Sequence, residues 1–498
     1  MSKCKIRNLR ENPFALYSAE EEIEILREIY FEPKYYRELM DNAINGSSRI
    51  LVGQRGLGKS STIHFLFKDL SNNSTLPLLI TRYDGIPLTK NENYFLYKIL
   101  QSLANGLAKL MFTNPKARKY LNSTQKKRMA FFLELFYDKD TARDYYENAK
   151  EIKRKKRLYL LCSFYNKSLK AINLILDGLS KFGTDLIRRS IGLDSSDIQD
   201  AVKEYFHEVN LPEIKVASID EVVSFGRDRL KEMLDQMIEI SYSLGYHSIV
   251  VLFDKIDEFK DVNSEVEKVA DFAKDILQDT DLLYTKHLSI VFSLWSEVKR
   301  SLNKNNVRFD KFKDINIEWR IDDLEKLINK RLAYFSKDKT IPVTLETLLP
   351  LESDRLQILS LADSSPRSLI RLLSELYYQE EAEDVICFSP LAITKGTMQF
   401  CVKFDYCSLQ AMKIGGKGDL YSWINKVLQI KRHIFTYNDV IDTFSMKKDT
   451  NAVKYVNDML RLELVRELIP LDDQEERTFE VVDPRLKYLI SRGITELL

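Results

Sequence analysis

Short runs of apolar residues, each followed by polar residues, mark the buried strands of this 498-residue chain. The runs Arg49–Val52, Ser248–Phe253 and 287–294 are apolar at almost every position, which is typical of strands covered on both faces of a parallel sheet. A further strand is expected near 78–84. Longer segments carry apolar residues at helical spacing. The pattern predicts an α/β fold in which helix predominates.

The composition is that of an ordinary globular protein of roughly three domains. Glycine (16) and proline (12) are scarce, which disfavours low-complexity and turn-dense all-β proteins, and the net charge of +1 names no partner. Five cysteines without a CxxC pair and five scattered histidines argue against a disulfide framework or a zinc ribbon. Because no signal-peptide pattern or long apolar run is present, we expect a cytoplasmic protein without membrane contact.

The loop after the first strand carries a phosphate-binding pattern. Residues 53–60 read GQRGLGKS, which fits GxxxxGK[ST] between a strand and a helix. In that context backbone N–H groups and the helix N-terminus point at phosphate oxygens, whereas a chance glycine-rich turn lacks these neighbours. Lys59 would reach the β- and γ-phosphates, and Ser60 would ligate Mg²⁺. The expected nucleotide-binding residues are Gly53, Gln54, Arg55, Gly56, Leu57, Gly58, Lys59, Ser60 and Ser61, with the three glycines permitting positive φ and close approach.

Hydrolysis of a bound nucleotide also requires carboxylates, one to hold the metal ion and one to polarise water. The run Ser248–Phe253 ends in Asp254, at the strand end where open α/β sheets place ligands, so we assign Asp254 to Mg²⁺. Asp257 or Glu258 would act on the water, or the pair opens the next helix as its acidic first turn. We expect the tips of the strands before Lys59 and Asp254 to be adjacent.

GQRGLGKS followed much later by VVLFDKIDEF resembles the additional-strand P-loop ATPases, specifically the AAA+ and STAND classes. The resemblance covers roughly residues 46–110, 215–400 and 420–498. It implies ATP and Mg²⁺ as cofactors and catalytic roles for Lys59 and for Asp257 or Glu258. It departs at Lys255, where the STAND pattern usually has Gly or Asp.

Residues 318–332 and 365–373 resemble the helical lid of these ATPases. The second segment, SPRSLIRLL, is similar to the lid helix that carries a second sensor. By this resemblance Arg367 reaches the γ-phosphate and couples closure of the lid to the nucleotide state. The alternative role for Arg367 is a helix cap after Pro366.

A basic insertion separates the two motifs. Between Met111 and Ser190 the chain has 19 Lys and Arg against 8 Asp and Glu. The cluster KRKKR at 153–157 lies among tyrosines and phenylalanines, a mixture suited to phosphate contacts and stacking. The insertion is therefore a candidate surface for nucleic acid or another acidic partner, and the alternative is a solvated helical surface.

The carboxyl-terminal residues predict helices at 437–444 and 452–461, followed by a hairpin of 464–469 and 478–482. This order describes a winged helix, with Val453, Val456 and Leu460 on one apolar face of its second helix. Residues 421–498 carry 12 Lys and Arg against 13 Asp and Glu, a balance that favours a regulatory module over a DNA reader.

The expected fold is an α/β P-loop NTPase core with a parallel sheet of the additional-strand type, a large α-helical insertion, a helical lid and a C-terminal winged helix. The expected domains are an N-terminal helical segment (1–45), the core (46–110 and 215–310), the insertion (111–214), the lid (311–400) and the winged helix (420–498).

The resemblance implies a slow ATPase that works as a nucleotide-controlled switch or assembly motor. We expect it to form a homo-oligomer and to act with a partner effector protein, as in prokaryotic antiviral defence. The alternative is an ATP-dependent DNA-binding factor of the origin-recognition or transposition type. A third interpretation is a scaffold whose phosphate loop is vestigial.

Overall fold

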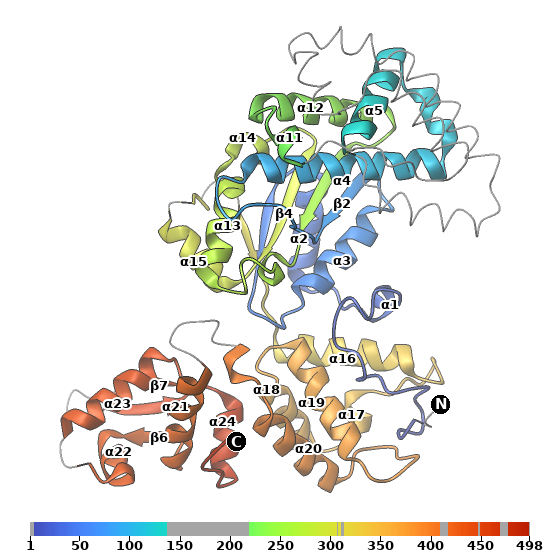
Figure 1. Cartoon of the computed structure of the whole chain (residues 1–498). Coiled ribbons are helices and arrows are strands. Elements are labelled where there is room, and N and C mark those ends of the chain that lie inside the picture. The colour runs from blue at the N-terminus through green and yellow to red at the C-terminus, as the bar shows by residue number, and fades with distance from the viewer. Residues whose placement is uncertain are drawn as a thin grey trace.

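The computed structural model describes residues 4–136, 219–305, 307–309, 313–408, 417–446, 449–468 and 477–497. These residues form a core, a helical lid below it and a carboxyl-terminal module beside the lid (Figure 1). Within this described part, no helix combines the length and the apolar character needed to cross a membrane.

The core is built on a five-stranded, all-parallel sheet. In spatial order its strands are β2 (Thr75–Ile80), β3 (Ser248–Phe253), β4 (Leu288–Leu294), β1 (Arg49–Val52) and β5 (Asp314–Asn316). Every residue of β3 and β4 is buried, which is why their sequences read as unbroken apolar runs. The parallel P-loop NTPase sheet of the additional-strand type is therefore confirmed.

β4 lies between β1 and β3, so the expectation that the tips of β1 and β3 are adjacent is wrong. Since neighbouring strands lie about 4.8 Å apart, the two tips are separated by roughly 10 Å. The added strand also packs tightly against β3, because Phe253 and Phe292 stack with their ring centroids 4.7 Å apart.

Helices cover both faces of the sheet, because successive strand residues point to opposite sides. Leu51, Val250 and Val291 belong to the cluster that contains α2 and α3, whereas Ile50, Val251 and Phe292 belong to the cluster on the other side. The core helices are α1 (Leu26–Ile29), α2 (Lys34–Ile44), α3 (Lys59–Leu70), α4 (Glu92–Thr113), η1 (Pro115–Tyr120), α5 (Ser123–Phe136), α11 (Ile219–Val223), α12 (Arg227–Ser243), η3 (Ile256–Glu258), α13 (Val266–Gln278), α14 (Thr280–Leu283) and α15 (Ser296–Lys304).

The described start of the insertion belongs to the core. Met129, Phe132 and Phe136 of α5 are buried in the same cluster as α4. The basic cluster at 153–157 and its neighbouring aromatic residues lie outside the described residues.

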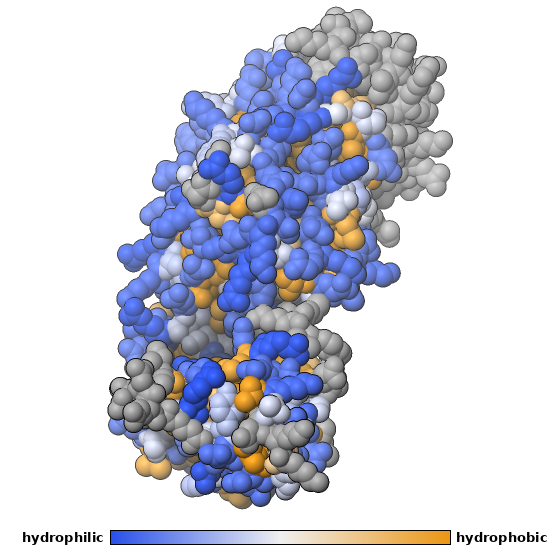
Figure 2. Space-filling model, turned by 90° about the vertical axis from the view of Figure 1, so that its left-hand side faces the viewer, coloured by the Kyte–Doolittle hydropathy of each residue, from blue (hydrophilic) through white to orange (hydrophobic). Residues whose placement is uncertain are grey.

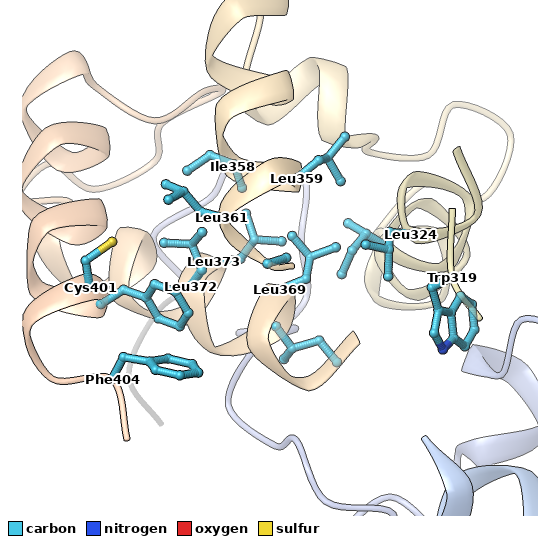
Figure 3. Close-up of a cluster of buried hydrophobic side chains, with 14 of the residues drawn as sticks. Trp319, Leu324, Ile358, Leu359, Leu361, Leu369, Leu372, Leu373, Cys401 and Phe404 are labelled. Carbon is cyan, nitrogen blue, oxygen red and sulfur yellow. The ribbon is translucent and has the colours of Figure 1, made fainter. Parts of the chain in front are cut away.

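The lid consists of α16 (Ile321–Phe335), α17 (Leu345–Leu348), α18 (Glu352–Leu361), α19 (Pro366–Gln379) and α20 (Pro390–Val402), followed by the turn η4 (Tyr406–Ser408). Figure 3 shows leucines of α18 and α19 directed at one another, with Trp319 at the edge of the cluster next to the core. Residues 4–25, before α1, contain no helix and run along the lid, where Ile6 pairs with Val385 and Leu9 with Ser336.

The carboxyl-terminal module contains α21 (Lys417–Gln429), β6 (Ile434–Thr436), α22 (Tyr437–Phe444), α23 (Asp449–Arg461), β7 (Val465–Glu467), β8 (Thr478–Val481) and α24 (Pro484–Ser491). The strands pair antiparallel in the order β6-β8-β7, so the predicted strands do pair and a third, unpredicted strand joins them. The predicted apolar face of α23 is wrong at Val453, which is 39% exposed, because Ala452, Val456 and Met459 point into the core.

Candidate functional site

The phosphate loop has the backbone that its sequence predicts. Gly56 and Gly58 adopt φ of +81° and +87°, and Gly58 leads directly into α3. Gly53 is needed for a different reason than the expected positive φ. A β-carbon at Gly53 would lie 3.2 Å from Cβ of Ile317, so the packing under the loop leaves little room for a side chain there.

Lys59 is the first residue of α3, and its side chain turns back over the loop. The Nζ group donates hydrogen bonds to the carbonyl oxygens of Gly53 (2.8 Å) and Gln54 (2.9 Å). Burial lowers the pKa of Lys59 to about 8, although Asp257 and Asp254 oppose this shift. Lys59 and the two carboxylates therefore share one electrostatic environment, even though they come from different strands.

Asp254 follows β3 and is only 2% exposed. Its Oδ2 atom has no hydrogen-bond partner among the residues that the structure describes. Its backbone carbonyl accepts a hydrogen bond of 2.7 Å from the hydroxyl of Tyr83, which fixes the tip of β3 against the end of β2. A buried, unpartnered carboxylate oxygen is costly unless it binds a cation, so Asp254 fits the predicted Mg²⁺ ligand, and the role of the Ser60 hydroxyl as a second ligand stays a prediction.

The two candidate water-activating residues differ in environment. Asp257 has a side chain that is 17% exposed, with its Oδ2 atom 3.8 Å from Nη2 of Arg55. Glu258 is 61% exposed and lies 3.8 Å from Nζ of Lys255. Burial raises the pKa of both carboxyl groups, and Lys59 opposes this effect at Asp257. Both residues lie in the short turn η3 rather than at the start of α13, so they do not form the acidic first turn of that helix.

Arg55 connects the phosphate loop with the segments that follow β3 and β4. Besides Asp257, its Nη2 atom contacts the hydroxyl of Ser264 at 3.0 Å, and its guanidinium lies 4.4 Å from the ring centroid of Trp295. Ser264 in turn donates a hydrogen bond to the carbonyl oxygen of Asp257. The sequence predicted Arg55 only as a loop residue, because its partners are about 200 positions away.

The lid touches the phosphate loop directly. The hydroxyl of Ser365 and the backbone N–H of Arg367 each donate to the carbonyl oxygen of Gly56, at 3.3 Å. The indole Nε1 of Trp319 donates to the carbonyl oxygen of Leu57 at 2.9 Å. Ser365, not Arg367, caps α19, since its side chain accepts the N–H of Ser368. The Arg367 side chain is exposed and interacts electrostatically with Lys59, and its contact with a γ-phosphate stays a prediction.

Two groups near Asp254 were not predicted. His64, one turn after Ser60 on α3, interacts electrostatically with Asp254, and its buried Nε2 has no hydrogen-bond partner in the described ranges. Lys255 is paired with Glu20 of the amino-terminal segment at 2.6 Å. No motif links Glu20 to this site, although the departure at Lys255 from the family pattern was a signal that something there differs.

Ser293, a polar residue near the end of β4, is buried within that strand, which continues to Leu294. Lys454 and Arg461 are exposed on α23, and Arg461 pairs with Asp458 at 3.1 Å. Neither residue belongs to the phosphate-loop site.

The chain matches no protein-family model and no curated protein. Among solved structures it is similar to the Aeropyrum pernix ORC2 protein in its ADPNP-ADP complexes, with 11% identity, 98% of each chain covered and a TM-score of 0.39. It is also similar to Cdc6p from Pyrobaculum aerophilum (11% identity, 98% of each chain, TM-score 0.32) and to the Walker-type ATPase paby2304 of Pyrococcus abyssi (12%, 98% of each chain, 0.36). The assignment of the fold rests on the sheet order and the phosphate loop described above.

Proposed function

We propose that this protein binds and hydrolyses ATP and works as a nucleotide-controlled switch of the AAA+ or STAND type. The observation that carries the proposal is the convergence at the phosphate loop. Lys59 shares its surroundings with Asp254 and Asp257, and the lid residues Ser365 and Arg367 contact Gly56 of the same loop. A purely structural loop has no need for a buried ammonium beside two carboxylates.

In this proposal the loop N–H groups and the amino end of α3 bind the phosphates, and Lys59 leaves the loop carbonyls to contact the β- and γ-phosphates. Ser60 and Asp254 hold Mg²⁺, which supplies neutralisation of phosphate charge when it is bound. Asp257 orients the attacking water, because it interacts electrostatically with Lys59, whereas Glu258 is exposed and pairs with Lys255. The ion pair with Arg55 restricts movement of the Asp257 side chain. This restriction agrees with the slow ATP turnover that the resemblance implies.

The lid is the element that would respond to the nucleotide. Its contacts with the loop are few and directional, so a change in the position of Gly56 moves the amino end of α19 with it. Closure around ATP and release after hydrolysis would change the surface offered to a partner effector protein or to a second copy of the chain. Antiviral defence is one setting for such a switch.

A fluorescent ATP analogue and a phosphate-release assay test the proposal with native protein, Lys59→Ala and Asp254→Asn. We expect Lys59→Ala to lose most of its affinity and Asp254→Asn to lose the Mg²⁺ dependence of binding. Undiminished binding by Lys59→Ala would place the nucleotide elsewhere. Measurement of particle size with and without a nonhydrolysable ATP analogue tests the homo-oligomer.

A second candidate is an ATP-dependent DNA-binding factor, favoured by the helix–helix–hairpin order of the carboxyl-terminal module and by the exposed Lys454 and Arg461 on α23. Figure 2 shows one face of the molecule on which hydrophilic residues predominate, and this does not distinguish the two functions. A salt titration of duplex binding does. Failure to bind duplex at every ionic strength, with and without ATP, would eliminate this candidate.

A further inference from the structure

The residue after Asp254 carries a positive charge in a demanding backbone conformation. Lys255 has φ of +61°, in the left-handed region that disfavours residues with a β-carbon. Its Nζ atom lies 2.6 Å from Oε1 of Glu20 and 3.8 Å from Oε2 of Glu258. Strained residues that carry specific contacts are concentrated at functional sites, which directs attention to what this ammonium does.

Glu20 belongs to a segment that also contacts helix α16 of the lid. Two residues later, Glu22 forms a buried ion pair with Arg331 of α16, in which the two side chains are 8% and 4% exposed. Arg331 further donates to the carbonyl oxygen of Leu16 at 2.8 Å. The segment 16–22 therefore contacts Lys255, next to the tip of β3, through Glu20 and contacts the lid through Glu22.

The charge of Lys255 opposes cation binding at the neighbouring carboxylate. Lys255 interacts electrostatically with both Asp254 and Glu258, so an unpaired ammonium there would compete with Mg²⁺ for them. The Glu20 carboxylate supplies the compensating negative charge. Burial would raise the pKa of Glu20, but the hydrogen bond from Lys255, a backbone hydrogen bond and the charge of Lys255 together lower it, which favours the carboxylate form.

We propose that Glu20 is a positioning residue that holds Lys255 and neutralises its charge. Glu20 thereby sets the Mg²⁺ affinity of the Asp254 site. Because the ion pair of Glu22 with Arg331 fixes the same segment to the lid, this Mg²⁺ affinity depends on the position of the lid. The inference rests on the proposed ATP site. In addition to the contacts at the phosphate loop, it links the lid to Asp254 through the segment that carries Glu22 and Glu20.

The test is a titration of Mg²⁺ that follows binding of a fluorescent nonhydrolysable ATP analogue, so hydrolysis is not needed as a readout. Glu20→Gln is expected to raise the Mg²⁺ concentration for half-maximal binding by about fivefold, since an uncompensated charge then lies near the site. Glu20→Asp should shift it less. The matched control is Glu24→Gln, which removes the same charge from an exposed residue two positions after Glu22 and should behave as native protein.

The double variant Glu20→Gln with Lys255→Met decides whether Lys255 transmits the effect. Removal of the ammonium makes its compensation unnecessary, so the double variant should need no more Mg²⁺ than native protein. An unchanged fivefold shift in the double variant would show that Glu20 acts by another route and would overturn the proposal.

Dependence on the lid is tested with Glu22→Gln, because replacement of the buried Arg331 endangers folding. Thermal unfolding first establishes that Glu22→Gln is folded. It should raise the Mg²⁺ requirement in the native background and have no effect in the Lys255→Met background, and equal shifts in both would contradict the coupling. If native protein bound no nucleotide at any Mg²⁺ concentration, the ATP site itself would be refuted. If native protein bound nucleotide normally and Glu20→Gln and Glu24→Gln gave identical titrations, only this inference would be refuted.

Discussion

Arg485 of α24 and Asp363, in the turn before α19, are joined by a hydrogen bond of 3.1 Å between Nη2 and Oδ2. Arg485 is 1% exposed and also binds both carboxylate oxygens of Asp483. Asp363 and Ser364 have φ of +50° and +58° and lead directly into Ser365, whose hydroxyl contacts Gly56. The carboxyl-terminal module is thus tied to the turn that meets the phosphate loop.

Replacement of Arg485 should cost substantial stability. Arg485→Met leaves Asp483 without its partner and is expected to lower the free energy of unfolding by about 3 kcal/mol. Asp363→Asn should cost less, because that side chain is 50% exposed. Urea denaturation measures both. The control is Arg492→Met on the exposed end of the same helix, and equal losses for Arg485→Met and Arg492→Met would contradict a structural role for this ion pair.

Gly56→Ala should separate the lid from the phosphate loop. A β-carbon there would lie 2.8 Å from Oγ of Ser365, in addition to the strain of positive φ. We expect a loss of about 1–2 kcal/mol in stability and a loss of ATP-analogue affinity of about tenfold or more.

Gly493→Ala is the matched control, because Gly493 has φ of +73° and open space around the added carbon. It should lose similar stability and keep nucleotide affinity. Ser365→Ala in the Gly56→Ala background removes the close contact, so it should restore part of the affinity. No recovery would show that the φ strain alone weakens binding.

The two carboxylates after Asp254 should differ in their effect on turnover. Asp257→Asn is expected to lower kcat about 100-fold, the usual range for loss of a group that positions or deprotonates water. Glu258→Gln should change kcat little, because Glu258 is exposed and pairs with Lys255. Phosphate release at saturating ATP measures both. A normal rate for Asp257→Asn together with an inactive Glu258→Gln would transfer the role to Glu258.

Cys401 should resist alkylation in the folded protein. Burial raises the pKa of Cys401 to about 12, so at pH 9 only about one thiol in a thousand is ionised. Iodoacetamide labelling followed by mass spectrometry should therefore modify the partly exposed Cys387 and leave Cys401 unmodified. Equal labelling rates would contradict this burial.

The same pKa shift affects stability in a definite direction. An unfolded chain releases the Cys401 proton near pH 9, before the folded chain does. The stabilising contribution is therefore complete below pH 9 and is lost as the pH rises toward 12. Urea denaturation between pH 8 and pH 11 follows the decline, for which Cys401→Ala provides the reference.

Local patterns predicted most strands of the core, although β2 covers Thr75–Ile80 rather than the expected 78–84 and the short β5 was not predicted. β1 and β3 have the predicted bounds, and α3 begins at Lys59, because an unbroken apolar run or a glycine-rich loop leaves few alternatives for the backbone. The predicted α22 also matches, since a Thr436 capping box fixes its start. The position of β4 between β1 and β3 was not predicted, because a local pattern does not give the order of strands in a sheet.

Contacts between distant residues could not be predicted. The pairing of Lys255 with Glu20 and of Arg55 with Ser264 depends on tertiary packing across more than 200 positions. Gly53 illustrates a subtler limit, because the sequence shows that a small residue is present without showing whether φ or packing requires it. At α23 the helical period and the burial of Val456 were predicted correctly, but Val453 was not, because Val453 and Ala452 are both apolar and only the neighbouring elements decide which one is buried.

The strand inserted between β1 and β3 has a consequence for ligand choice. The phosphate loop follows β1 and Asp254 follows β3, and β4 lies between these two strands. A ligand must therefore extend beyond the loop to contact both the loop and Asp254. A nucleoside monophosphate bound at the amino end of α3 would contact only the phosphate loop, whereas each further phosphate would bring the ligand closer to Asp254. For the proposed ATP site we therefore expect binding that uses Asp254 to strengthen with the number of phosphates, independently of the base.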